Sequence, residues 1–197
     1  NTTTGAVTVN NAAPSGTYTV TVITTDNCGA TTQATFQLTV NDPPTITGAT
    51  ISRQQGSPAL NSQIATVMDT EDAENTLAMT VNGGAMATVN GVTVSNIMVD
   101  ASGNVTADVV ASCMATNATF ALTVTDSNGA SANGTLTVNI TPNTPPSVGA
   151  YPTTNVNASA GTMVTPSAAP ADNGSIVSAT VTASAGFTGT LSIDQMT

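Results

Sequence analysis

The acidic side chains are the residues of this chain that could hold a metal ion. Asp69, Glu71 and Asp72 fall within four consecutive positions, whereas Asp42 and Asp126 stand apart from them in the sequence. Calcium takes about six to eight oxygen ligands, several of them carboxylates. The pattern therefore admits a calcium site. It also fits a solvated acidic loop whose Asp residues cap turns, and the sequence leaves both interpretations open.

Two cysteines, Cys28 and Cys113, could form a covalent crosslink. A disulfide requires Cα atoms about 4.4–6.8 Å apart, so the fold decides whether these two can meet. The alternative is a pair of free, partly buried thiols.

The residue types that are missing exclude most catalytic chemistry. The chain has no His, and Arg53 is its single basic residue against 11 acidic ones, which gives a net charge of −10. Without His, Ser-His-Asp and Cys-His catalysis and zinc chemistry have no basis. The negative charge repels a phosphate backbone, and no apolar run approaches the roughly 20 residues of a membrane span. We predict a protein that is not an enzyme, binds no nucleic acid and inserts into no membrane.

Apolar and polar residues alternate along much of the chain, which predicts half-buried β-strands. Tyr18, Val20 and Val22 share one face of an expected strand, and Phe36, Leu38 and Val40 share a face of the next. Seven further strands are expected near 45–51, 63–68, 75–82, 92–99, 104–110, 117–125 and 131–140, and no segment has a helical period. Short strands at this spacing indicate an all-β fold of Greek-key sandwiches of immunoglobulin type.

The last hairpin of this pattern occurs twice, at an offset of 100 residues. Thr25–Ala30 reads Thr-Asp-Asn-Cys-Gly-Ala, and Thr125–Ala130 reads Thr-Asp-Ser-Asn-Gly-Ala. We therefore expect one complete domain at 42–141. Residues 1–41 would form the C-terminal half of a split domain. Residues 142–197 would form the N-terminal half of the next split domain, completed by the equivalent of 1–41 in the next copy. The 197 residues would then be one period of an array.

Three motifs support a family resemblance. They are the Asn-x-Pro-Pro linkers at 41–44 and 143–146, the acidic segment Val67–Asp72, and the hairpin Leu-Thr-Val-Thr-Asp-x-x-Gly at 122–129. Together they resemble bacterial tandem Ig-like and cadherin-like repeats of giant extracellular surface proteins. The resemblance implies an extended extracellular rod, as in adhesin stalks and fibres, and names no ligand.

This fold would place the candidate residues at the ends of the sandwiches. Cys28 would lie in the last hairpin turn of the split domain, and Cys113 at the opposite end of the complete domain, so the expected disulfide joins Cys113 of one copy to Cys28 of the next. The acidic residues of the complete domain would face the preceding domain, at a junction that resembles the calcium sites of cadherin-like repeats. Asp26 and Asp172 occupy matching positions at the other junction, where fewer carboxylates gather.

The functional expectation is a non-catalytic structural repeat of an extracellular bacterial fibre or adhesin stalk, whose partners are neighbouring copies arranged head to tail. One alternative is a separate, pilus-like subunit that polymerises by strand complementation. A third is a ligand-binding module that uses the loops at the sandwich ends.

Overall fold

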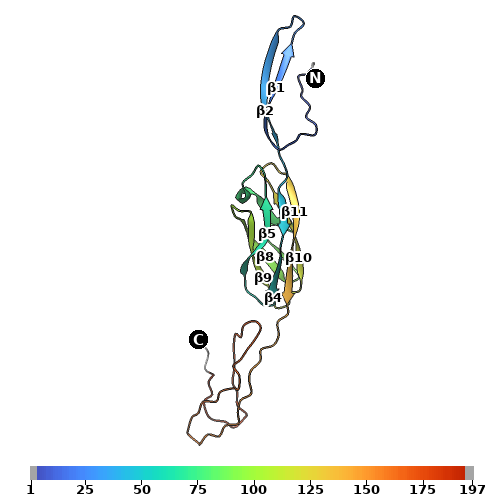
Figure 1. Ribbon diagram of the computed structural model, residues 1–197. Helices are drawn as coiled ribbons and strands as arrows, with labels where there is room; N and C mark the ends of the chain where they lie inside the picture. The colour runs from blue at the N-terminus through green and yellow to red at the C-terminus, as the bar shows by residue number, and fades with distance from the viewer. Residues whose placement is uncertain (1–3, 194–197) are drawn as a thin grey trace. The chain divides into compact units, whose positions relative to one another are not determined.

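The computed structural model describes residues 4–193 and divides into two compact units, which separate between Ile140 and Thr141. Every regular element of the described residues is a β-strand, apart from one short 3₁₀ turn (Figure 1). The expectation of an all-β protein is therefore confirmed. Among these residues, no helix is long and apolar enough to cross a membrane.

The first unit begins with a β-hairpin of two long strands, β1 (Gly16–Thr25) and β2 (Thr31–Val40). The strands are antiparallel and in unbroken register, with Val20 opposite Phe36 and Thr25 opposite Thr31. These two strands form a sheet of their own. The sequence explains the hairpin, because Asp26 and Gly29 supply the turn chemistry between two alternating strands.

The same unit contains a sandwich of two sheets. The first sheet has the order β4-β11-β10-β6 and the second has the order β3-β5-β9-β8-β7. The strands are β3 (Thr45–Gly48), β4 (Thr50–Gln54), β5 (Leu60–Met68), β6 (Ala78–Val81), β7 (Ala87–Val89), β8 (Val92–Val99), β9 (Asn104–Ala111), β10 (Ala118–Thr125) and β11 (Ser131–Thr141). The order is that of a Greek-key sandwich whose first strand is divided between the sheets.

The structure departs from the expected strands in four places. The strand expected at 45–51 is broken after Gly48, and its two parts join different sheets as β3 and β4. Gly48 permits this because its Cα lies against the backbone of Thr135 in β11, where a side chain would not fit. The segment expected at 75–82 opens with the 3₁₀ turn Glu74–Thr76, and β7 was not expected at all. Finally, β5 starts at Leu60, three residues before its expected start, and a bulge between Gln63 and Ala65 interrupts its alternation.

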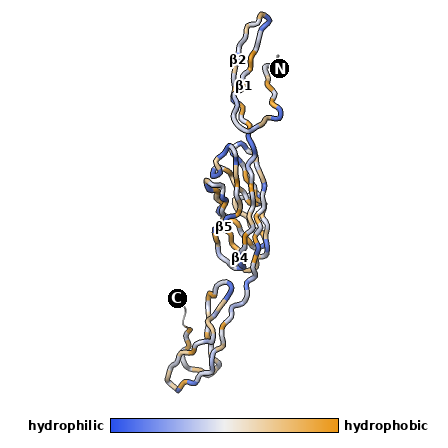
Figure 2. Tube along the Cα trace, in the orientation of Figure 1, coloured by the Kyte–Doolittle hydropathy of each residue, from blue (hydrophilic) through white to orange (hydrophobic). Residues whose placement is uncertain are grey.

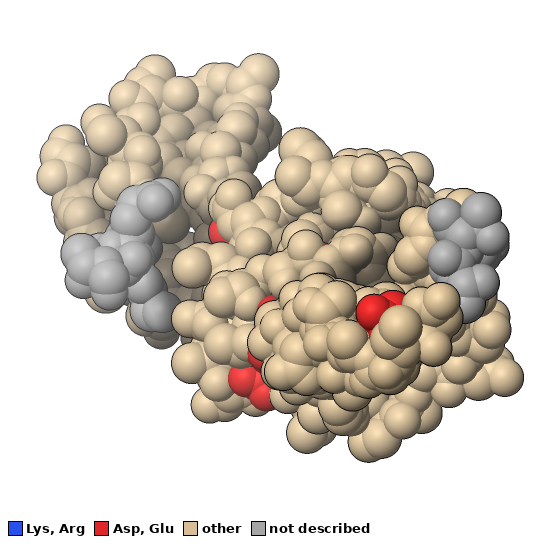
Figure 3. Space-filling view, turned by 90° about the horizontal axis from the view of Figure 1, so that it is seen from above, with Lys and Arg blue, Asp and Glu red and all other residues tan. Residues whose placement is uncertain are grey.

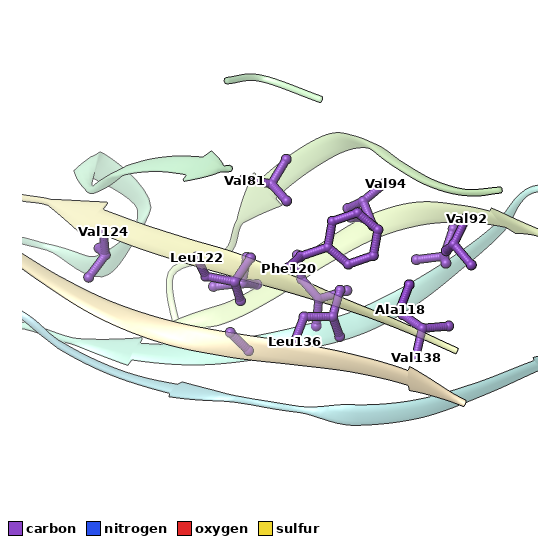
Figure 4. Close-up of a cluster of buried hydrophobic side chains, with 14 of the residues drawn as sticks. Val81, Val92, Val94, Ala118, Phe120, Leu122, Val124, Leu136 and Val138 are labelled. Atoms are coloured by element: carbon purple, nitrogen blue, oxygen red, sulfur yellow. The ribbon is translucent and has the colours of Figure 1, made fainter. Parts of the chain in front are cut away.

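The core of the sandwich lies between its two sheets (Figure 4). Along β10, alternate residues are buried, and Phe120, Leu122 and Val124 are fully enclosed. Leu136 and Val138 of β11 and Val92 and Val94 of the opposite sheet pack with them. Each large apolar side chain that is buried here contributes about 1.5–3 kcal/mol to the stability of the fold by leaving water. Burial of this core is therefore the main force that holds the two sheets together.

Arg53, the chain's single basic residue, lies in β4 and is 9% exposed. Its Nη2 donates a hydrogen bond to the carbonyl oxygen of Pro58, and its Nε has no hydrogen-bond partner. Burial lowers the pKa of this guanidinium from its ordinary value.

The second unit has extended backbone and little regular structure. Ser147 and Ala171 exchange two backbone hydrogen bonds of 2.8 and 2.9 Å in an isolated antiparallel bridge. None of residues 141–193 is buried, although apolar residues recur along them (Figure 2). Large apolar side chains such as Tyr151, Val177 and Phe187 are exposed. The described residues of this unit therefore include apolar side chains but form no buried core.

Candidate functional site

A partly exposed apolar sheet face is the most prominent candidate site. Along the hairpin β1–β2, the side chains of one face are Tyr18, Val20 and Val22 from β1, and Phe36, Leu38 and Val40 from β2. Tyr18 and Phe36 are 38% and 39% exposed. An isolated two-stranded hairpin is only marginally stable in water, so covering this face would stabilise the hairpin.

The hairpin β10–β11 shows what such a face looks like when it is covered. Phe120 faces Leu136 across that hairpin as Val20 faces Phe36 across the first, and both pairs occupy the same register at an offset of 100 residues. Phe120 and Leu136 are both 0% exposed. The two hairpins are thus the same structural element in two environments, one inside a sandwich and one outside.

Their turns also have the same hydrogen bonds. Asp26 Oδ1 accepts from the N–H groups of Cys28 (2.8 Å) and Ala30 (2.9 Å). Asp126 Oδ1 accepts from the N–H groups of Asn128 (2.9 Å) and Ala130 (2.8 Å). This is an Asx turn in both cases, and it confirms the turn chemistry expected from the sequence.

A second candidate site connects the end of β2 to the sandwich, and we call it the polar joint. It consists of Asn41, Asp42, Glu71, Asp126 and Asn128. Asn41 Nδ2 donates to Asp126 Oδ2 at 2.7 Å, and Asn41 Oδ1 accepts from Asn128 Nδ2 at 2.8 Å. The N–H of Asp42 donates to Glu71 Oε2 at 3.4 Å. The amide of Asn41 therefore fixes the β10–β11 turn to the chain that enters β3.

The remaining acidic residues lie in the loop that follows β5. Asp69 Oδ1 accepts from the N–H groups of Glu71 (2.9 Å) and Asp72 (2.8 Å). The Asp72 carboxylate accepts from Ser127 in the β10–β11 turn, through its N–H at 2.7 Å and its Oγ at 3.0 Å. Asp69 Oδ2 is buried and has no hydrogen-bond partner. The acidic loop and the β10–β11 turn are thus brought together by Asp72 and Ser127.

The donors around these carboxylates determine what the polar joint can do. Asp126 is 7% exposed, and the hydrogen bond from Asn41, followed by those from the turn backbone, lowers the pKa of its carboxyl. Among residues 4–193, no group of three or more His, Cys, Asp or Glu side chains is arranged to hold a metal ion. To bind here, calcium would have to displace the hydrogen bonds that Ser127 donates to Asp72 and that Asn41 donates to Asp126. In this arrangement, Asp69 Oδ2 is the one buried oxygen of the group without a partner.

Charged groups are sparse on the surface. The face shown in Figure 3 has a few separate acidic patches and no basic one. Arg53, the single basic residue, is buried in β4, so the described surface carries no basic side chain.

Both cysteines are free and exposed. Cys28 lies in the β1–β2 turn, and Cys113 lies in the loop between β9 and β10. Asn117, in that same loop, accepts a hydrogen bond from the N–H of Ile140 at 2.7 Å, so the loop adjoins the end of β11. Cys113 is therefore close to the point where the chain leaves the sandwich. The disulfide between consecutive copies stays a prediction.

Sequence reasoning did not identify Asn41, Asn128 or Ser127 as parts of a site. A signal existed for Asn41, because Asn-x-Pro-Pro occurs at both 41–44 and 143–146. The roles of Ser127 and Asn128 depend on which loop approaches the β10–β11 turn, and the sequence does not specify that.

No protein-family model matches this sequence, and no curated protein matches it. Among solved structures, the chain is similar to one described as Protocadherin Gamma B2 extracellular cadherin domains 3–6, with 19% sequence identity and a TM-score of 0.36. The match covers 71% of this chain and 36% of that one. A likeness of this size carries no argument about ligands or function.

Proposed function

We propose that this chain is a non-catalytic structural unit of an extracellular bacterial fibre or adhesin stalk, built as an extended rod of Ig-like sandwiches. One observation carries the proposal. The β1–β2 hairpin repeats the register and turn of β10–β11, yet no side chain of its apolar face is buried, and none of residues 141–193 is buried. The hairpin lacks a second sheet to pack against, and residues 141–193 lack a hairpin to pack around. In copies joined head to tail, each would supply what the other lacks.

The linkers suit a rod. Pro43-Pro44 and Pro145-Pro146 each stand at the start of a domain, and paired prolines hold the chain extended. The polar joint adds hydrogen bonds beside the first of these linkers. Short, stiff linkers of this kind resist bending between successive sandwiches and so favour an extended rod.

The composition supports a passive role outside the cell. The chain has no His for acid–base catalysis, and only 6% of its residues are charged. A surface rich in Thr, Asn and Ser with few charges is suited to an extracellular fibre. Calcium is not part of this proposal, because Asp126 and Asp72 already accept hydrogen bonds from Asn41 and Ser127.

The second candidate is a noncovalent polymer of pilus-like subunits. The edges of the two-stranded sheet β1–β2 favour it, because an open sheet edge accepts a strand from another chain. The two candidates differ in whether successive units share one polypeptide.

Electron microscopy of the purified 197-residue chain tests the proposal. We expect linear, unbranched filaments that lengthen with protein concentration. A chain that stays monomeric at every concentration tested would contradict the structural role. A denaturing gel of the native material, boiled with reductant and chelator, then separates the candidates. A band near 19.3 kDa indicates separate subunits, and material of very high mass indicates a continuous repeat.

A further inference from the structure

The second unit begins as the sandwich begins. In the sandwich, Thr45 of β3 pairs with Met68 of β5, and Asp69 follows at once. In the second unit, Ser147 pairs with Ala171, and Asp172 follows at once. The pairing continues through Gly149 N–H to Ala168 O at 3.1 Å and Ser167 N–H to Ala150 O at 2.9 Å. Residues 147–150 and 167–171 are therefore antiparallel neighbours, as β3 and β5 are, although their register slips by one residue after the Ser147–Ala171 bridge.

The loops after these pairs share their hydrogen bonds as well. Asp172 Oδ2 accepts from the N–H two residues later, that of Gly174, at 3.0 Å, as Asp69 Oδ1 does from Glu71. Asn173 Oδ1 accepts from the N–H of Thr144 at 3.1 Å, and Glu71 Oε2 accepts from that of Asp42. The two acceptors stand one residue after Asp172 and two residues after Asp69, so the bonds are similar in kind and differ in position.

A third detail is common to the two loops. Asp69 Oδ2 and Asp172 Oδ1 are both buried without a hydrogen-bond partner. Thr144 and Asp42 also each precede a Pro-Pro pair. The correspondence therefore extends from the linker to the acidic loop.

What the second unit lacks is the hairpin that fills the sandwich. In the complete domain, β10 and β11 lie between β6 and β4. The candidate counterpart of β6 is 177–181, where Val177, Ala179 and Val181 alternate as Leu77, Met79 and Val81 do. Val177 and Val181 are 91% and 43% exposed. A hairpin with the register of β10–β11 would cover this strand.

We propose that residues 142–193 of a second copy of this chain close around the β1–β2 hairpin, with β1 and β2 in the places of β10 and β11. This inference rests on the proposed rod and specifies its interface. Since Leu122 of β10 lies opposite Val81 of β6, Val22 lies opposite Val181 of the second copy. The occupant is a second copy because the hairpin has the register of β10–β11 at an offset of 100 residues, and residues 142–174 repeat the linker, the first antiparallel pairing and the acidic loop of the sandwich.

The polar joint supplies a specific contact for this interface. Asn41 stands two residues before Pro43-Pro44 and holds Asp126. Asn143 stands two residues before Pro145-Pro146, and Asp26 occupies the position of Asp126 in the first hairpin. Asn143 of the second copy therefore donates to the Asp26 carboxylate, as Asn41 does to Asp126.

A circular permutant tests the inference directly. The chain is reordered so that residues 142–197 come first and are followed by 1–141. The native order is the matched control, because composition and mass are identical. We expect the native order to associate with concentration and the permutant to be a monomer. In the permutant, amide exchange across residues 16–40 should slow by at least about a hundredfold relative to the native-order monomer, because covered strands exchange only through larger openings.

The contact is tested in the permutant by Asn143→Ala, with Asn41→Ala as its counterpart. Each substitution should lower the folding equilibrium constant of its own sandwich by about tenfold, the usual effect of losing a hydrogen bond to a charged group. No effect of Asn143→Ala beside a clear effect of Asn41→Ala would overturn the Asn143–Asp26 contact.

The outcomes separate the inference from the proposed function. If both the native order and the permutant form filaments, assembly uses another surface, and this inference is overturned while the rod stands. Fast exchange across residues 16–40 in a monomeric permutant also overturns it. A native-order chain that never associates overturns the rod, and with it the second copy as occupant.

Discussion

Asn41 and Asp126 are 85 residues apart in the sequence, and their side chains are joined by a hydrogen bond of 2.7 Å. This single contact connects the strand that enters the sandwich to the turn between its last two strands. It also contributes most to the lowered pKa of the Asp126 carboxyl. The strength of this contact, which holds the β10–β11 turn, should therefore depend on pH.

Asn41→Ala should lower the melting temperature at neutral pH by several degrees, since it removes this donor from a nearly buried carboxylate. Asn61→Ala is the control, because Asn61 makes only an exposed 3.4 Å contact with Asp108 and should shift the melting temperature little. Thermal unfolding followed by circular dichroism measures both. Equal melting temperatures for the two variants would show that the Asn41 contact contributes nothing to stability.

The pH dependence follows from the same residue. The pKa of Asp126 is lowered in the folded state from its ordinary value of 3.8, so its contribution to stability is present above that value and is lost as pH falls further. The wild-type melting temperature should therefore drop as pH falls below about 4. In Asn41→Ala this drop should be smaller, because the largest cause of the shift is gone. Parallel curves for both proteins would contradict the assignment.

Equivalent residues of the two hairpins should respond differently to truncation. Leu136→Ala removes a fully buried side chain and should cost about 2–5 kcal/mol of unfolding free energy. Phe36→Ala, at the same position of the first hairpin, should leave the unfolding of the sandwich unchanged and weaken association between copies. Urea unfolding and light scattering measure the two effects. A large loss of sandwich stability in Phe36→Ala would contradict the independence of the hairpin.

Gly48 is the residue at which the first strand changes sheets. Gly48→Ala should destabilise the sandwich strongly, because the added Cβ would collide with the backbone of Thr135. Gly161→Ala is its control, since nothing lies within 4 Å of a Cβ at that position. Expression level and urea unfolding of the two variants provide the comparison, and equal stabilities would show that β11 moves aside at little cost.

The proposed disulfide predicts a ladder of oligomers. Oxidised wild-type assemblies should give multiples of the monomer mass on a non-reducing gel, and Cys28→Ser and Cys113→Ser should each give monomer alone. An equal mixture of the two variants should give dimers and nothing larger, because one crosslink remains per pair. Monomers in every lane, with both thiols free to label after denaturation, would rule the crosslink out.

Calcium titration decides between the two interpretations of the acidic residues. A calcium site would raise the melting temperature, and chelation would lower it. We expect equal melting temperatures in calcium and in chelator, because N–H and O–H donors already engage Asp72 and Asp126. A rise of several degrees with calcium, absent in Asp69→Asn, would instead identify Asp69 Oδ2 as a ligand.

Most strands and turns of the sandwich could be predicted from the sequence, because the alternation of apolar residues and the turn residues are local signals. The alternation of Phe120, Leu122 and Val124 predicted β10, and Asp126 with Gly129 predicted its turn. The break at Gly48 could not be predicted, because it depends on how closely β11 approaches. The same holds for Asn41, whose partner Asp126 is determined by the packing of a distant turn. The bulge in β5 hid its start, since Ile64 and Ala65 are both buried and interrupt the alternation.

The burial of Arg53 has a consequence for digestion. With no Lys in the chain, the bond after Arg53 is the single place where trypsin can cut. That bond lies within β4, and the guanidinium is turned inward onto the Pro58 carbonyl. A protease must bind an extended, accessible segment, so cleavage requires the sandwich to open. The folded protein should therefore resist trypsin almost completely, and the rate at which two fragments appear would report directly on how often the sandwich opens.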